Sequence, residues 1–380
     1  MTSFLIDVAE HKDNESGDTK SLDILPSHEE DRDRGPKGEK NELGQSIAMI
    51  SNTMQHLEPC AIDIPHGPVE SLVFLGAGQH IVGLCKDGSI RHWGTSNLHE
   101  IGSAMKPDGK ARVVVASPDG KWIVSGGVDR KVTIWNAISH QKASELAGEQ
   151  CQTGVTALDI SPDSSLTAAG SEDGIVLVWR LEGGKRIAGP LKHEEVKISS
   201  VKFSPTGDGL ASACTAWGYS SIRIWDSRTG RQLACLSTDN RPTHSLAWTS
   251  DGQQLFAGGP YGSIKCFYIA GEPRAIPMLY RDQIFDSVTS LCVSNNDRFL
   301  VAGSASARSL SLWDVNTLQQ FGPTFQQASE VLSVAISPDN QRLVIGTSDK
   351  RISIQSLSDI VPMAYFFHAS VLLYFATSRD

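Results

Sequence analysis

The chain has 380 residues, of which 40% are hydrophobic, 7% aromatic and 20% charged, with 34 Gly and 17 Pro. This composition excludes a coiled coil, a collagen and a wholly disordered chain. The formal net charge of -9 argues against the basic surface typical of nucleic-acid-binding domains, so nucleic acid is not expected as a partner. Residues 1–9 lack a basic start and a long apolar run, so we expect an intracellular protein, cytoplasmic or nuclear, rather than a secreted one.

The first segment of the chain is polar and acidic. Residues 10–44 hold 11 Asp and Glu against 6 Lys and Arg and few apolar residues, so residues 1–45 are predicted to be a disordered acidic arm. Residues 46–57 then place Ile47, Ile50 and Met54 at helical spacing. A short helix is predicted there, which either lies on the edge of the following domain or docks on a partner.

Residues 58–358 consist of short apolar runs separated by turn residues, and they form an internal repeat. Seven of the runs end in Trp or in a residue that replaces it. These ends are Trp93, Trp135, Trp179, Trp225, Phe267, Trp313 and Gln355. Successive ends are 42 to 46 residues apart, which gives each unit room for four short strands.

A second marker repeats with the same period. Turns similar to Ser-Pro-Asp-Gly begin at residues 117, 161, 204, 249, 294 and 337, with a degenerate copy at 75. Such turns join the strands of tight hairpins. A single unit cannot bury both of its faces, and closure into a ring buries them without long free edges. The sequence therefore predicts an all-β fold, a seven-bladed β-propeller of four-stranded antiparallel blades.

The residues at the strand ends resemble a known family. Val-Thr-Ile-Trp-Asn at 132–136, Arg-Ile-Trp-Asp at 223–226 and Ser-Leu-Trp-Asp at 311–314 are similar to the repeats of WD-repeat (WD40-type) β-propellers. The likeness covers roughly four-fifths of the chain. It implies a rigid disc with a central channel, used as a platform for protein partners. No cofactor is expected.

The resemblance also implies a structural role for an Asp six residues before the Trp. In the family this Asp supports the turn between the second and third strands of a blade and contacts a His or backbone at the blade's start. Asp87, Asp129, Asp173 and Asp349 hold that position here. His66 and His193 are the matching histidines.

Blades 4, 5 and 6 depart from this pattern, since Tyr219, Tyr261 and Ala307 stand at the Asp position. Together with Trp217 and Arg308 the two tyrosines predict a partner-binding surface, because aromatic residues and Arg dominate interface hot spots. The alternative is that the tyrosines only pack over degenerate blades. Weaker candidates on the same rim are Lys86, Arg130, Glu172 and Lys350.

The two ends of the repeat region compete for one position, the outermost strand of the last blade. Residues 59–64 and residues 359–365 both fit it, although Pro362 lacks an N–H and suits an edge better than a centre. Within the tail, 359–380, residues 360–376 are mostly apolar. Three interpretations of the tail remain open: a membrane anchor, a strand and helix packed on the last blade, or a poorly folded end.

No catalytic or metal-binding motif stands out. The seven Cys contain no C-x-x-C pair and are expected to be reduced core residues. We therefore predict a non-enzymatic scaffold that binds other proteins or peptides through loops on one face, with no metal. The alternatives are an adaptor tethered to a membrane by the apolar tail and, more remotely, a propeller enzyme. The sequence indicates neither a particular partner nor an oligomeric state.

Overall fold

The computed structural model describes residues 60–147, 153–193, 196–215, 220–239, 241–269, 274–278 and 287–366. The chain divides into two units, residues 1–55 and 56–380, and all of the described residues belong to the second. The predicted arm (1–45) and helix (46–57) lie outside the described residues. So do Trp217, Tyr219 and the tail after residue 366.

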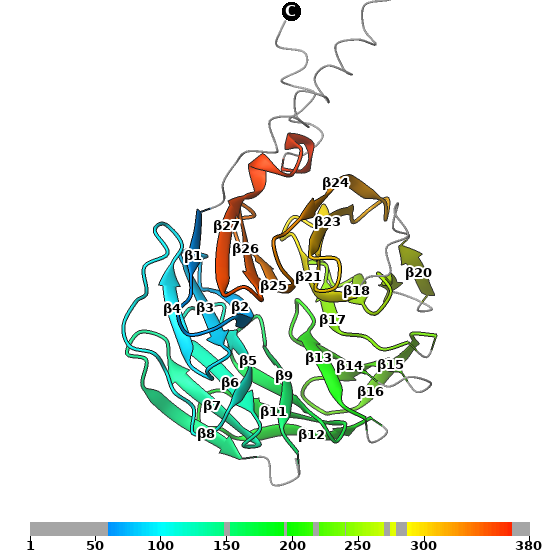
Figure 1. The fold of residues 1–380 in the computed structure, drawn as a ribbon. Coiled ribbons are helices and arrows are strands. Elements are labelled where there is room, and N and C mark those ends of the chain that lie inside the picture. The colour runs from blue at the N-terminus through cyan, green and yellow to red at the C-terminus, as the bar shows by residue number, and fades with distance from the viewer. Residues whose placement is uncertain are drawn as a thin grey trace, which may run out of the picture. The chain divides into compact units, whose positions relative to one another are not determined.

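Seven antiparallel sheets follow one another along the chain and lie in a ring (Figure 1). This confirms the predicted seven-bladed propeller. Blades 1 to 3 are β2 (Val69–Leu75), β3 (His80–Cys85) and β4 (Ile90–Gly94); β5 (Ala111–Ala116), β6 (Trp122–Gly127), β7 (Lys131–Asn136) and β8 (Lys142–Ala147); and β9 (Val155–Ile160), β10 (Leu166–Ser171), β11 (Ile175–Arg180) and β12 (Arg186–Lys192).

Blades 4 to 7 are β13 (Ile198–Phe203), β14 (Gly209–Cys214), β15 (Ser221–Asp226) and β16 (Gln232–Ser237); β17 (Ser245–Trp248), β18 (Gln254–Gly258), β19 (Ile264–Tyr268) and β20 (Arg274–Met278); β21 (Val288–Val293), β22 (Phe299–Ser304), β23 (Ser309–Asp314) and β24 (Gln320–Gln326); and β25 (Val331–Ile336), β26 (Arg342–Thr347), β27 (Arg351–Ser356) and β1 (Cys60–Asp63). The six Trp or Phe ends named above all lie in the third strand of their blade.

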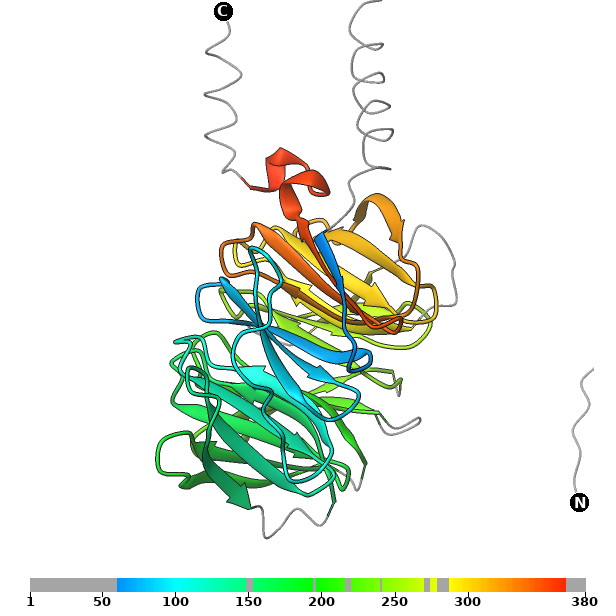
Figure 2. The same ribbon diagram turned by 60° about the vertical axis from the view of Figure 1, so that its left-hand side comes forward.

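The ring closes through a strand from the N-terminal side. β1 pairs with β27 from Cys60 opposite Ile354 to Asp63 opposite Arg351, and Figure 2 shows the two strands side by side. Of the two predicted candidates, the segment 59–64 therefore supplies the outermost strand. Residues 359–365 do not, because the chain turns after β27 into two short 3-10 helices, Leu357–Asp359 and Met363–Tyr365.

The described part of the tail packs on blade 6. The ring of Tyr365 stacks on Phe321 with centroids 4.2 Å apart, and Nδ2 of Asn296 donates a hydrogen bond to the carbonyl of Tyr365 at 2.8 Å. This segment is therefore neither a strand nor a longer helix as far as residue 366. Within the described ranges, the structure contains no helix with the length and apolar character needed to cross a bilayer.

In blades 2 to 7 a small residue near the end of the second strand lets the blade approach the next one. This position is Leu84, Gly126, Gly170, Ala213, Gly258, Gly303 and Gly346 in blades 1 to 7, as the pairing of second and third strands shows. A Cβ on Gly170 would lie 2.4 Å from Cγ2 of Ile198 in the next blade. Blade 1 reverses the sizes, because Leu84 lies in one cluster with Ala111 of blade 2. The blade spacing thus depends on complementary pairs of a small and a large residue.

Blade 1 differs from the other six, which have four strands each. Its sheet has three strands, and two isolated bridges, Ile90 to Met105 and Trp93 to Glu100, replace the outer strand. The intervening residues include Gly102, whose φ of 67° is incompatible with a regular strand. The outer segment of blade 1 is therefore irregular.

Four described cysteines, Cys85, Cys214, Cys266 and Cys292, are buried or half-buried, and all six described cysteines are free. The prediction of core cysteines is wrong for Cys60 and Cys235, which are exposed. Both lie on the outermost strand of a blade, β1 and β16, where one side of the sheet faces solvent.

Candidate interaction surface

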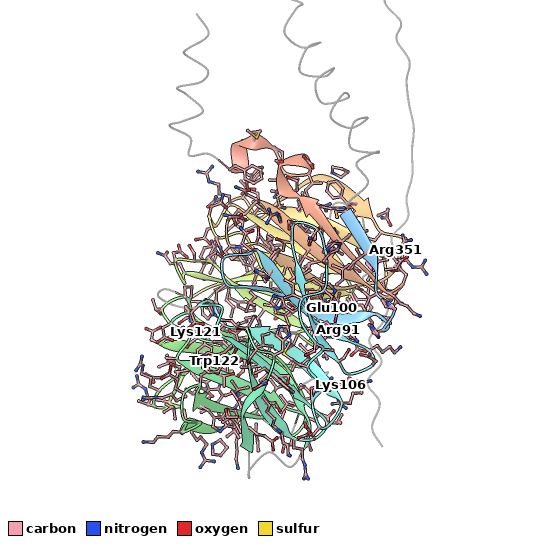
Figure 3. The ribbon with its side chains drawn as sticks, turned by 90° about the vertical axis from the view of Figure 1, so that its left-hand side faces the viewer. Arg91, Glu100, Lys106, Lys121, Trp122 and Arg351 are labelled. Atoms are coloured by element: carbon pink, nitrogen blue, oxygen red, sulfur yellow. The ribbon has the colours of Figure 1, made fainter. Side chains whose placement is uncertain are left out.

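The disc has two faces with different turns. The turns between second and third strands and the links between blades lie on one, here called the upper face. The turns between first and second and between third and fourth strands lie on the other, the lower face. Lys121 near the lower face and Arg351 near the upper face appear on opposite sides of the molecule in Figure 3.

The Asp residues of the repeat accept hydrogen bonds inside their own turns on the upper face. Oδ1 of Asp87 accepts from the backbone N–H of Ser89 at 2.9 Å and from its hydroxyl at 2.6 Å, while Oδ2 lies 3.8 Å from Nδ1 of His66. Burial acts to raise the pKa of Asp87, but these hydrogen bonds hold it below the usual value.

The other three aspartates have similar surroundings. Asp349 accepts from the Thr347 hydroxyl at 2.6 Å, Asp173 accepts from the Ser171 hydroxyl, and Asp129 accepts from the backbone of Lys131 at 3.3 Å. These contacts are what turn support requires.

His193 connects blade 3 to the Trp of blade 4 through a shared serine. Ser212 Oγ lies 2.7 Å from Nε2 of His193, and Nε1–H of Trp225 donates to the same oxygen at 2.7 Å. Burial, with the nearby charge of Arg223, lowers the pKa of His193 to about 3. The neutral imidazole therefore stabilises the fold above its ordinary pKa, and this contribution is lost as the pH falls toward 3.

Several non-glycine residues on the lower face have positive φ, and their side chains explain why. Ser164, Asp297 and Asn340 have φ of 53° to 58°. Each accepts a hydrogen bond from a backbone N–H of the neighbouring blade, those of Asp119, Ser250 and Asn295. These contacts tie adjacent turns together, which offsets the cost of the left-handed backbone.

Among the described turns between second and third strands, on the upper face, four have such a residue at the tip. These residues are Arg130 (φ 64°), Tyr261 (φ 57°), Arg308 (φ 52°) and Lys350 (φ 72°), and all four are exposed. Blades 1 and 3 have Gly88 and Gly174 with positive φ in the equivalent turns. A long side chain costs about 1 kcal/mol or more there relative to Gly. No described residue hydrogen-bonds or ion-pairs with the side chains of Arg130, Arg308 or Lys350, so no contact among the described residues explains their positive φ.

Together with Lys86, these four residues form a continuous series around the ring. Tyr261, Arg308, Lys350, Lys86 and Arg130 lie on blades 5, 6, 7, 1 and 2 respectively, and we call them the turn arc. Lys86 is also exposed and forms no ion pair with a described residue. Other cations of the chain do, among them Arg112 with Glu172 and Lys265 with Asp239.

Glu172 stands apart from the turn arc. Its carboxylate accepts a hydrogen bond from Arg112 of blade 2, and this bond lowers the pKa of Glu172 below the usual value. The geometry therefore assigns this candidate an ion pair between blades 2 and 3. Its charge is already balanced within the fold.

Two carboxylates lie inside the turn arc, between blades 6, 7 and 1. A hollow of about 360 Å³ opens there, and its wall includes Glu70 and Glu330 together with Lys86 of the turn arc. Acidic side chains therefore line part of the surface beside the turn arc. Among the described residues, no group of three or more His, Cys, Asp or Glu is placed to hold a metal ion.

The structure brings some of the predicted residues together and leaves others untested. Tyr261 and Arg308 lie on neighbouring blades as predicted, while Trp217 and Tyr219 lie outside the described residues. Sequence reasoning ranked Arg130 and Lys350 as weak candidates because a single exposed charge is usually only solvated. The signal it missed is that each occupies a turn position that is Gly in blades 1 and 3.

Comparison with known proteins agrees with the architecture. The family described as "WD domain, G-beta repeat" matches residues 108–136, 282–314 and 319–354, and "Anaphase-promoting complex subunit 4 WD40 domain" matches residues 158–251. Together these matches fall in blades 2 to 7.

Three similar proteins come from rice, fly and worm. The chain is 32% identical to small ribosomal subunit protein RACK1y of Oryza sativa subsp. japonica over 166 residues, 41% of this chain and 46% of the relative. Small ribosomal subunit protein RACK1 of Drosophila melanogaster is 33% identical (39% and 47%), and that of Caenorhabditis elegans 34% (39% and 46%). The chain thus spans slightly less than half the length of these relatives. From its repeats, its seven blades and these matches, the chain belongs to the WD-repeat β-propeller family.

Proposed function

We propose that this protein is a non-enzymatic scaffold whose turn arc binds acidic segments of partner proteins. The observation that carries the proposal is the set of exposed cations with positive φ, Arg130, Arg308 and Lys350, which have no partner among the described residues. At Ser164, Asp297 and Asn340 on the lower face the same backbone conformation serves contacts between blades. On the upper face a partner outside the chain would account for its cost.

The charge distribution favours an acidic partner that follows the rim. Four cations lie on four consecutive blades, 6, 7, 1 and 2, and Tyr261 adds an aromatic contact at the end of the series. Glu70 and Glu330 beside the turn arc would repel an acidic segment. The segment would therefore run along the turns and not enter the hollow that these two residues line. Trp217 and Tyr219 of blade 4 would extend the aromatic end.

The test replaces three arc residues by glycine, Tyr261→Gly, Arg308→Gly and Lys350→Gly together. Glycine adopts positive φ freely, so the variant should melt within a few degrees of the wild type. We expect quantitative affinity purification from native cells to recover specific partners at least about tenfold less efficiently, since losing hot-spot residues costs more than about 1.4 kcal/mol.

A matched control removes exposed positive charges from the lower face, with Lys185→Ala, Arg228→Ala and Arg231→Ala. Partners should persist with the control and be lost with the arc variant. If these partners are lost with the control and kept with the arc variant, the proposal is overturned. Recovery that falls as the salt concentration rises supports an acidic partner, because exposed ion pairs are screened.

The names of the three relatives suggest one partner to test first. Each is named as a protein of the small ribosomal subunit. Sedimentation of cell extract through a sucrose gradient measures whether this chain travels with ribosomes. If it does, the arc variant should move to the top of the gradient while the lower-face control remains with the ribosomes.

A further inference from the structure

Three histidines form a continuous hydrogen-bonded row between blades 1 and 2. Nδ1 of His80 lies 2.9 Å from Nε2 of His92, and Nδ1 of His92 lies 3.0 Å from Nε2 of His140. Nδ1 of His140 in turn lies 3.0 Å from the carbonyl oxygen of Ser103. His92 and His140 are buried and His80 is half-buried. No sequence motif links these residues, because His140 comes 48 positions after His92.

The carbonyl at one end fixes the direction of every bond in the row. A carbonyl oxygen only accepts, so Nδ1 of His140 carries a hydrogen and Nε2 of the neutral ring accepts. His92 must then donate from Nδ1 and accept at Nε2, and His80 must donate from Nδ1. All three neutral rings are therefore Nδ1–H tautomers. The free lone pair is on Nε2 of His80, to which no described residue hydrogen-bonds.

The row holds together the irregular part of the fold. His140 takes φ of 57° in the turn after β7 and places its ring against Gly102, where a Cβ would lie 2.6 Å from Nδ1. The N–H of Ile101 donates to the carbonyl of His92 at 2.7 Å, and that of Met105 to Ile90 at 2.8 Å. His140 thus packs against the irregular outer segment of blade 1, and the row connects this contact to β4 and β3.

We propose that His80, His92 and His140 form a one-proton relay that pins residues 97–107 between blades 1 and 2 and releases this segment in acid. One proton adds to Nε2 of His80 and leaves every hydrogen bond intact, because each N···N contact still contains one hydrogen. A second proton places two N–H groups against each other in one contact. That contact breaks, and the row no longer holds the ring of His140 against the carbonyl of Ser103, so residues 97–107 keep only their hydrogen bonds to β4.

The charged residues around the three histidines affect the pKa of His92 less than burial and the other two histidines do. Charged or titratable residues on the adjoining elements are Arg91, His99, Glu100, Lys106, Asp108, Asp119, Lys121, Lys142 and Arg342. Arg91 pairs with Glu100 at 2.5 Å, and the two residues are labelled close together in Figure 3. Arg91 points to the opposite side of β4 from His92, because neighbouring residues of a strand alternate. Burial first, then His80 and His140, lowers the pKa of His92 to about 4.

This sets the pH range of the release. The folded pKa of His92 lies below its ordinary value of 6.5, so the opened segment binds more protons than the closed one between pH 6.5 and 4. The closed state is therefore fully favoured above pH 6.5, and its advantage is lost as the pH falls toward 4. Hydrogen exchange of the Leu98, Ile101 and Met105 amides, corrected for intrinsic rates, should accelerate more than about tenfold between pH 7 and pH 4.5.

Two variants and one spectrum test the relay. His92→Gln removes the central titrating ring, so the amides of residues 97–107 should exchange faster than in the wild type at both pH values. The ratio of their corrected exchange rates at pH 4.5 and pH 7 should then be near one. The control His99→Gln removes an exposed histidine from the same segment and should keep the wild-type ratio. If the ratio of exchange rates in His92→Gln is the same as in the wild type, the proposal is overturned.

The spectrum uses the unmodified protein and does not depend on a variant folding. In ¹⁵N NMR of histidine-labelled full-length chain at neutral pH, three rings should show a protonated Nδ1 and an unprotonated Nε2. An Nε2–H tautomer assigned to His92 or His140 would contradict the direction of the hydrogen bonds in the row and overturn the proposal.

Discussion

Trp225→Ala should destabilise the full-length protein by about 3 to 5 kcal/mol, which is the usual cost of removing a large buried aromatic side chain. Trp225 is 5% exposed and packs between blades 3 and 4 in one cluster with Ile198, Val201 and Phe203. The substitution also removes the N–H that donates to Ser212, a residue with no exposed surface. Urea unfolding followed by circular dichroism measures the loss.

Trp225→Phe separates packing from hydrogen bonding. The benzyl ring keeps most of the apolar contact and removes only the donor, so a cost of about 1 to 2 kcal/mol is expected. Trp248→Phe is the matched control, because Trp248 donates to the carbonyl of Lys202 at 3.2 Å but is only half-buried. A loss in Trp225→Phe no larger than in Trp248→Phe would show that the Ser212 contact adds nothing to stability.

The sequence predicts the fold well because the fold is repeated. Trp93, Trp135 and Trp179 recur at a nearly fixed distance, and each lies in the third strand of a blade. A pattern repeated seven times determines the number of blades even when one copy is degenerate, as at Gln355. The sequence does not decide which segment, 59–64 or 359–365, supplies the outermost strand of blade 7, since both are apolar enough to form a strand. The structure assigns this strand to residues 60–63.

The irregular features were not predictable in the same way. Nothing in the composition of residues 97–107 indicates that the ring of His140 will pack against this segment, because that contact joins two blades and depends on the position of Gly102. The turn arc is an intermediate case. Its residue types were visible, but the positive φ of Arg130, Arg308 and Lys350, and the lack of described partners for their side chains, are properties of the folded chain.

The complementary pairs between blades lead to the second prediction, a cycle of two substitutions at the junction of blades 3 and 4. Gly170→Leu alone should cost at least about 3 kcal/mol, since even a Cβ would lie 2.4 Å from Cγ2 of Ile198, which has no exposed surface and no room to move. Ile198→Ala alone should cost about 2 to 5 kcal/mol through the cavity it leaves.

The double variant reproduces at this junction the arrangement that blade 1 already uses, with Leu84 facing Ala111. The leucine would enter the space vacated by Ile198, so the double variant should be more stable than the sum of the single effects by about 2 kcal/mol or more. Urea midpoints of the four proteins measure this coupling. Additive losses would show that contacts other than the facing pair determine the spacing of blades 3 and 4. They would also show that the exchange of small and large residues found in blade 1 does not work at this junction. A favourable coupling would show that one pair of side chains, of either order in size, determines how closely two neighbouring blades pack.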